Sequence, residues 1–225
     1  MNKIITVLLM ISIGIVSCKK ESSAPVTKPA EYMIFSPSSS WNYETIDNAT
    51  ASTLNYTVIS TNKDTLANGK TYHVFTSSTG NNEYYNVTGH EYFSFQNLPT
   101  QLGGTAVQNL YLKDNIAINN SWTQTYNVTI SGLPITVNLT NTVTEKGISK
   151  IINAINYSEV IHISTAISIS VLGMPVPTNA LTTDIQSYYA KNYGMIQSKN
   201  KINLNYNGIV NNTDQITKLK IAVIK

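Results

Sequence analysis

Arginine is absent from this 225-residue chain, and all 15 basic residues are lysines. Bidentate recognition of phosphates and guanines depends on the planar guanidinium group of arginine. The formal net charge is only +3, so a lysine-rich electrostatic surface does not replace it. Together these properties argue against nucleic acid as a partner.

Cysteine and histidine are also scarce. The single cysteine, Cys18, excludes a disulfide scaffold and a cysteine-based metal site. The three histidines, His73, His90 and His162, show neither His-x-His nor His-Glu-x-x-His spacing. We therefore expect no metal and no other cofactor.

Catalytic signatures are missing as well. The chain has no Gly-x-Ser-x-Gly elbow, and its twelve carboxylates form no recognisable acid/base pair in the sequence. We expect no catalytic residues and no enzyme activity. One alternative stays open, because a hydrolase needs only two carboxylates close in space, and strands could bring together Glu83, Glu91, Glu145 or Glu159.

Only one long apolar run exists, at residues 4–16, and it ends at Ile15-Val16-Ser17-Cys18. A helix of this length spans roughly 20 Å, short of the ~30 Å bilayer core, so residues 1–17 fit a signal peptide better than a membrane helix. The site resembles the lipobox of bacterial lipoproteins. That resemblance implies an acylated (for example palmitoylated) Cys18 as the membrane anchor, with residues 18–31 as a flexible tether. No aspartate follows Cys18, which favours the outer membrane and leaves the leaflet open.

The composition of the rest predicts an all-β protein. Asparagine and threonine occur 27 times each, and both are poor helix formers. Threonine suits pleated strands and asparagine suits turns. The one weak helix signal lies at residues 149–155.

Alternation of apolar and polar residues predicts individual strands. Residues 126–131 and 135–140 alternate around Gly132-Leu133-Pro134 and predict a hairpin. Residues 161–171 repeat the pattern, and Asn68-Gly69 and Asn207-Gly208 favour tight turns. The side chains expected on the inner faces of these strands are Tyr126, Val128, Ile130, Ile135, Val137, Leu139, Ile161, Ile163, Ile167, Ile169 and Val171.

Three landmarks recur in the same order and indicate an internal duplication. Trp41 is matched by Trp122, Tyr72 by Tyr157, and the pair Tyr84-Tyr85 by Tyr188-Tyr189. We expect residues 32–225 to form a single β domain with units at about 35–98 and 105–199 and a closing C-terminal hairpin at 200–225. The expected fold is an antiparallel curved sheet or partly closed barrel built from the two related meander units and that hairpin.

The same landmarks resemble a widespread group of Bacteroidota lipoproteins. Their shared features are a Trp-x-Tyr strand, a Gly-x-x-Tyr strand and a Tyr-Tyr-Ala-Lys-x-x-Gly-x-Ile segment, which here spans residues 188–196. The resemblance covers most of residues 35–199. This group has no agreed activity, so the resemblance implies no site residues.

Aromatic residues are the one enriched class of side chains suited to binding a ligand. Consecutive strand residues face opposite sides, so each tyrosine pair should place one ring outside the core. The ligand-binding residues expected from the duplication are Trp41, Tyr84, Tyr85, Tyr188 and Tyr189. We expect a non-catalytic envelope lipoprotein that binds or carries an apolar or glycan ligand. The alternative is a structural or accessory subunit of an outer-membrane protein complex, and a hydrolase is the third possibility.

Overall fold

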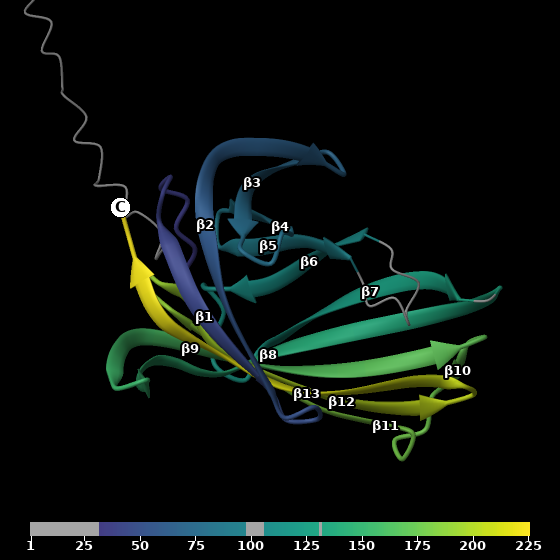
Figure 1. Ribbon diagram of the computed structural model, residues 1–225. Helices are drawn as coiled ribbons and strands as arrows, with labels where there is room; N and C mark the ends of the chain where they lie inside the picture. The colour runs from purple at the N-terminus through teal and green to yellow at the C-terminus, as the bar shows by residue number, and fades with distance from the viewer. Residues whose placement is uncertain (1–31, 98–105, 131) are drawn as a thin grey trace, which may run out of the picture.

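The computed structural model describes residues 32–97, 106–130 and 132–225, and every regular element in these ranges is a β-strand. The strands pair antiparallel and form one continuous curved sheet (Figure 1). The all-β, antiparallel fold expected from the sequence is therefore confirmed. Cys18, the expected signal peptide and the tether lie outside the described residues. That described part contains no helix long and apolar enough to cross a membrane.

The first half of the sheet is a meander of six strands in which each strand pairs with the next along the chain. Its strands are β1 (Ser40–Asp47), β2 (Ser52–Ala67), β3 (Lys70–Ser77), β4 (Asn82–Thr88), β5 (Glu91–Asn97) and β6 (Ala106–Lys113).

The second half repeats this plan with six main strands and one two-residue addition. Its strands are β7 (Ser121–Ile130), β8 (Leu133–Ile152), β9 (Ile155–Val171), β11 (Leu181–Ala190), β12 (Gly194–Tyr206) and β13 (Ile209–Val223), and the short β10 (Met174–Pro175) pairs only with β9. In Figure 1 the purple-to-blue first meander curls above the green-to-yellow second one.

The two meanders correspond strand by strand. Trp41 lies in β1 and Trp122 in β7, Tyr72 in β3 and Tyr157 in β9. The paired tyrosines lie in β4 and β11. The expected C-terminal hairpin at residues 200–225 is continuous with the strand before it, because β12 pairs with both β11 and β13, much as β5 pairs with both β4 and β6. The last two strands thus belong to the second meander, as β5 and β6 belong to the first.

The meanders are joined at the middle of the sheet by strands from opposite ends of the described chain. β1 pairs with β13 from Ser40 opposite Val223 to Asp47 opposite Gln215. The C-terminus consequently lies beside the start of β1, where the backbone N–H of Lys225 donates a hydrogen bond to Ser39 Oγ at 3.0 Å.

The two outer strands, β6 and β7, lie side by side without a backbone ladder, and side chains bridge the seam. Trp122 Nε1 donates to the carbonyl oxygen of Leu110 at 2.8 Å, and Gln124 Oε1 accepts from the N–H of Leu110 at 2.8 Å. The Tyr126 hydroxyl donates to the carbonyl oxygen of Gln108 at 3.0 Å. An unpaired strand edge is a template for aggregation, and these inward side chains of β7 satisfy the edge of β6.

The inner faces follow the expected alternation. Val128, Ile135, Val137, Ile169 and Val171 are buried together with Leu204 in one apolar cluster. A second cluster combines Trp122, Ile161 and Ile163 with aromatic residues of the first meander. The side chain of Ile130 lies outside the described residues.

A short segment ahead of β1, residues 32–34, packs into the apolar interior of the curved sheet, and we call it the plug segment. Tyr32 and Ile34 are 4% and 6% exposed and belong to different apolar clusters, while Met33 contacts both clusters. Gly194 lies next to this segment, and a Cβ there would make an ordinary contact at 3.4 Å with the carbonyl oxygen of Tyr32. What favours glycine at this position is its φ of +78°.

The weak helix signal at residues 149–155 is wrong. β8 continues to Ile152, pairs there with Ile155 of β9, and Asn153-Ala154 form the turn with φ of 50° and 66°. Pairing with a neighbouring strand overrides a local helix preference of this size. The tight turns expected at Asn68-Gly69 and Asn207-Gly208 are confirmed by positive φ at both residues of each pair.

Candidate ligand-binding site

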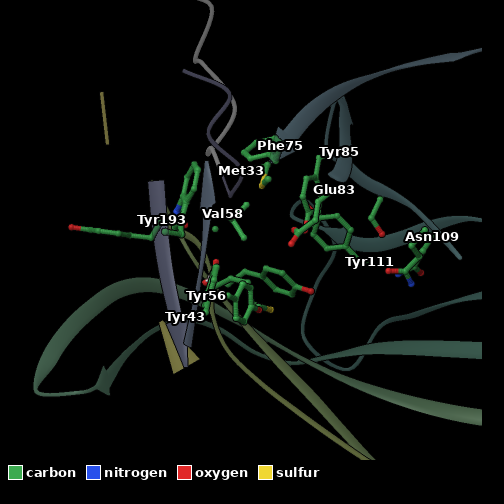
Figure 2. Close-up of a pocket in the computed structure, with 16 residues that line it drawn as sticks. Met33, Tyr43, Tyr56, Val58, Phe75, Glu83, Tyr85, Asn109, Tyr111 and Tyr193 are labelled. Atoms are coloured by element: carbon green, nitrogen blue, oxygen red, sulfur yellow. Dashed lines mark hydrogen bonds between the residues drawn. The ribbon is translucent and has the colours of Figure 1, made fainter. Parts of the chain in front are cut away.

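A cavity of about 190 Å³ lies on the inner side of the first meander, beneath the plug segment, and residues of β11 and β12 close it (Figure 2). Half of the residues in its wall are aromatic. The aromatic residues that line it are Trp41, Tyr43, Tyr56, Phe75, Tyr85, Tyr111, Tyr189 and Tyr193.

Strand alternation brings most of these rings to one face. Trp41 and Tyr43 are two residues apart in β1, and Tyr43 lies opposite Tyr56 of β2. Residues two apart in a strand share a face, so Glu83 and Tyr85 of β4 also point inward together. Tyr111 faces the cavity for a different reason. The pairing of β5 with β6 contains a register shift, and Tyr111 is the extra residue between Leu110 and Leu112.

The rings contact one another around the cavity. Tyr111 lies between Tyr85 and Tyr189, with ring centroids 6.1 and 5.4 Å away. Tyr43 stacks on Tyr56 at 5.5 Å. Figure 2 shows Glu83, Tyr85 and Tyr111 on one side of the space and Tyr43 and Tyr56 on the other. The arrangement offers aromatic surface from both sides to anything between them.

The tyrosine hydroxyls are held in the neutral, hydrogen-bonding form. Burial raises the pKa of Tyr56 and of Tyr189 to about 12. Burial also raises the pKa values of Tyr43, Tyr85 and Tyr111 well above the usual 10.0, and the negative charge of Glu83 adds to the shift at Tyr43 and Tyr85. The Tyr43 hydroxyl donates to the carbonyl oxygen of Met195 at 3.0 Å, which fixes its ring.

Glu83 is the one carboxylate among the described residues that line the cavity. Its Oε2 accepts a hydrogen bond of 2.7 Å from the Tyr85 hydroxyl. Burial raises the pKa of Glu83 above its usual 4.5, and the hydrogen bond from Tyr85 opposes that shift. The cavity therefore combines an aromatic wall with one shielded acid.

A polar cleft of about 650 Å³ adjoins the cavity along the β4–β5 hairpin. Glu83, Tyr85, Ser94 and Gln96 line both spaces. The other residues of the cleft are mostly amides and aromatics, namely Asn81, Asn82, Tyr84, Phe95 and Asn97.

Of the five residues expected to bind a ligand, the structure brings Trp41, Tyr85 and Tyr189 together at the cavity. Tyr84 points to the opposite side of β4 and lines the cleft instead. Tyr188 lies on the outer face, stacked on the His162 ring at 4.0 Å, with Lys150 Nζ 3.6 Å from its ring centroid. Each tyrosine pair thus splits between the two faces, as its strand requires.

The sequence did not predict five aromatic residues of the cavity wall, and it did not connect Glu83 with the aromatic residues; the five are Tyr43, Tyr56, Phe75, Tyr111 and Tyr193. Spacing carries a signal for Glu83, two residues before Tyr85, and for Tyr43, two residues after Trp41. No spacing predicts Tyr111, because its direction depends on the bulge between β5 and β6.

The carboxylates considered for a hydrolase do not meet. Glu91 pairs with Lys113 at 2.7 Å, and Glu145 pairs with His162 at 2.9 Å on the outer face. Glu159 is exposed, so none of the three joins Glu83. No group of three or more metal-ligating side chains converges anywhere in the described ranges.

Comparison with known proteins adds one likeness. No protein-family model matches the chain, and no curated protein matches it. The crystal structure of a candidate lipoprotein from Parabacteroides distasonis is similar, with a TM-score of 0.50 and 12% sequence identity. The match covers 85% of this chain and 98% of that one. At this identity the likeness concerns the fold.

Proposed function

We propose that this protein is a non-catalytic envelope lipoprotein, anchored through acylated Cys18, that holds a small ligand in the tyrosine-lined cavity. The observation that carries the ligand proposal is the convergence of aromatic rings from β1, β2, β4, β6 and β11 on one concave space. Ligand sites favour concave apolar surfaces with a few placed polar groups. Tyrosine supplies both, through its ring and its hydroxyl.

The dimensions favour a compact ligand over a long acyl chain. The cavity, at about 190 Å³, is smaller than the roughly 300–1,000 Å³ typical of pockets for drug-sized ligands. The adjoining cleft is rich in amide side chains, which hydrogen-bond to hydroxyl groups. A short glycan unit, with an apolar ring face and polar edges, fits this combination better than a fatty acid.

The lipoprotein part of the proposal rests on two supports. The sequence places Cys18 directly after an apolar run with a small residue before it. The protein from Parabacteroides distasonis that shares the fold is itself described as a candidate lipoprotein. An outer-membrane location agrees with the absence of aspartate after Cys18.

The test is a titration of the acylated protein, purified from membranes in detergent, with short oligosaccharides and with fatty acids. We expect saturable quenching of tyrosine and tryptophan fluorescence by a saccharide and a weaker response to fatty acids. Tyr111→Leu removes a ring of the cavity and should weaken binding, whereas Tyr206→Leu, near the opposite apolar cluster, should not. If no compound in either class bound, the carrier function would be wrong.

A further inference from the structure

Glu83 is the one carboxylate of the described residues that lines the cavity, and it has no cationic partner among them. Seven of the other carboxylates lie within ion-pair distance of a lysine or histidine, namely Glu44, Asp64, Glu91, Asp114, Glu145, Asp184 and Asp214. Asp47 instead accepts hydrogen bonds from Gln215 and two backbone N–H groups, and Glu159 is exposed to solvent. Glu83 is half-buried, and its one hydrogen bond in the described part of the chain comes from the Tyr85 hydroxyl.

Asp114 shows how this fold neutralises a buried carboxylate elsewhere. Its two oxygens are bonded separately, Oδ1 to His90 Nδ1 at 2.5 Å and Oδ2 to the Tyr92 hydroxyl at 2.7 Å. Glu83 has the equivalent of the second contact, from Tyr85, and lacks the first. No lysine or histidine is among the described residues that line its cavity.

The surrounding aromatic rings also favour a positive charge in the cavity. The face of an aromatic ring carries negative charge density and attracts cations, most strongly where water is excluded. Tyr43, Tyr56, Tyr111 and Tyr189 enclose the space next to Glu83. The chain already uses this contact outside the cavity, where Lys70 Nζ lies 3.2 Å from the Phe93 ring centroid.

We propose that the cavity recognises an organic cation, a primary or quaternary ammonium group carried by a small ligand, with Glu83 as its counter-charge and the tyrosine rings as its cage. This inference rests on the proposed binding function and names the chemical group that the site selects. An ammonium would supply the partner that Glu83 lacks, and the cage excludes the water that otherwise competes for it. The amide-lined cleft would then hold the uncharged remainder of the ligand.

Two sources of an ammonium fit this space, a choline-type headgroup and an amino sugar. The test therefore uses two pairs of probes that differ in charge but little in shape. Choline is compared with 3,3-dimethyl-1-butanol, and glucosamine with glucose. Calorimetric titration of the acylated protein in detergent at neutral pH measures each affinity.

We expect the charged member of at least one pair to bind roughly ten-fold or more tightly than its neutral counterpart. Glu83→Gln keeps the shape and the acceptor for Tyr85, and it should abolish that difference. Glu91→Gln is the matched control on the neighbouring strand, because Glu91 lies outside the cavity and pairs with Lys113. A response confined to choline or to glucosamine identifies the source.

The outcomes separate the two levels of the proposal. If the neutral probes or neutral oligosaccharides bound as tightly as the charged ones, the cation inference would be overturned while the binding function stood. If Glu83→Gln bound the cations as the wild type does, Glu83 would not be the counter-charge and the inference would also fail. If neither these probes nor the saccharides and fatty acids bound, both the cation inference and the proposed binding function would be wrong.

Discussion

A half-buried acid without a counter-charge places a cost on the folded protein. Burial raises the pKa of Glu83 above 4.5, so the native state binds this proton more tightly than the unfolded chain does. The stability contributed by the bound proton is fully present below the unfolded-state pKa and is lost as the pH rises through the folded-state pKa. Burial therefore makes ionisation of Glu83 less favourable in the folded protein than in the unfolded chain.

Glu83→Gln removes this ionisation and should raise the melting temperature at neutral pH. The gain should shrink towards zero near pH 4, where both proteins carry an uncharged side chain. Each kcal/mol corresponds to roughly 2–4 °C for a domain of this size, which thermal melts followed by circular dichroism resolve. Glu91→Gln serves as the control. A gain that was larger at pH 4 than at pH 7 would contradict the assigned direction of the pKa shift.

Cys18 is the residue on which the proposed location depends. Cys18→Ala should leave an unprocessed precursor that takes up no radiolabelled palmitate. The reason is that thioether acylation needs the thiol, and no other apolar run of comparable length follows in the sequence. The wild-type protein should carry the label, and an unlabelled wild type would refute the lipoprotein proposal.

At the scale of elements, the seam between β6 and β7 depends on side chains. Gln124 contributes most directly, since it accepts from the N–H of Leu110 and its Nε2 donates to the carbonyl oxygen of Gln108 at 3.4 Å. Gln124→Leu keeps the volume but leaves both backbone groups of β6 without that partner. Loss of a partner for a buried polar group costs about 1–3 kcal/mol, so we expect destabilisation in that range.

Hydrogen exchange measures this effect locally. The amide of Leu110 should exchange faster in Gln124→Leu than in the wild type. Amides of the β1–β13 joint should change only by the amount that the loss of global stability explains. Thr129→Val, on the exposed face of the same strand, is the control and should change neither stability nor exchange at Leu110. Unchanged protection of Leu110 in the Gln124 variant would show that the seam does not need this side chain.

Strand faces could be predicted from the sequence because alternation is local. Val128, Ile135, Ile163 and Val171 all lie inside as expected. Bulges break that rule, and the one that turns Tyr111 inward leaves no mark in the spacing of residues. The duplicated landmarks lie on corresponding strands of the two meanders, but they do not say which strands pair, and the pairing of β1 with β13 has no local signal at all. The candidate site depends on both alternation and bulges, and three of the eight aromatic residues in its wall, Trp41, Tyr85 and Tyr189, were predicted from the sequence.

At the scale of the whole molecule, two of the three apolar clusters found among the described residues draw buried residues from each meander. Trp41, Val58 and Phe75 pack with Tyr157 and Leu219 in one cluster. We therefore predict that residues 32–117 and 118–225, expressed separately, will not fold cooperatively, because each would expose half of these clusters. Circular dichroism melts of the two fragments and of their mixture test this. Two cooperative transitions from the isolated fragments would contradict a single folding unit.

Circular permutation tests the topology in the opposite direction. A chain that begins at Ile118, joins Lys225 to Tyr32 by a short glycine-serine linker and ends at Ala117 would place every paired strand next to its neighbour in sequence. We predict that this permutant adopts the same fold and refolds faster than the parent, because it replaces the longest-range pairing with a local one. Stopped-flow fluorescence measures the two rates. Slower refolding would mean that the β1–β13 joint does not limit the parent.

The plug segment connects the proposed lipid anchor to the wall of the cavity. If Cys18 is held by lipid, residues 19–31 can span at most about 45 Å, so the domain stays within that height of the bilayer surface. The tether ends at Tyr32, which is buried, and the next residue, Met33, forms part of the cavity wall. Tension on the tether would therefore act first on the wall of the cavity and only afterwards on the sheet. If the domain moved towards or away from a partner above the membrane and this movement stretched the tether, the force would then reach the ligand in the cavity.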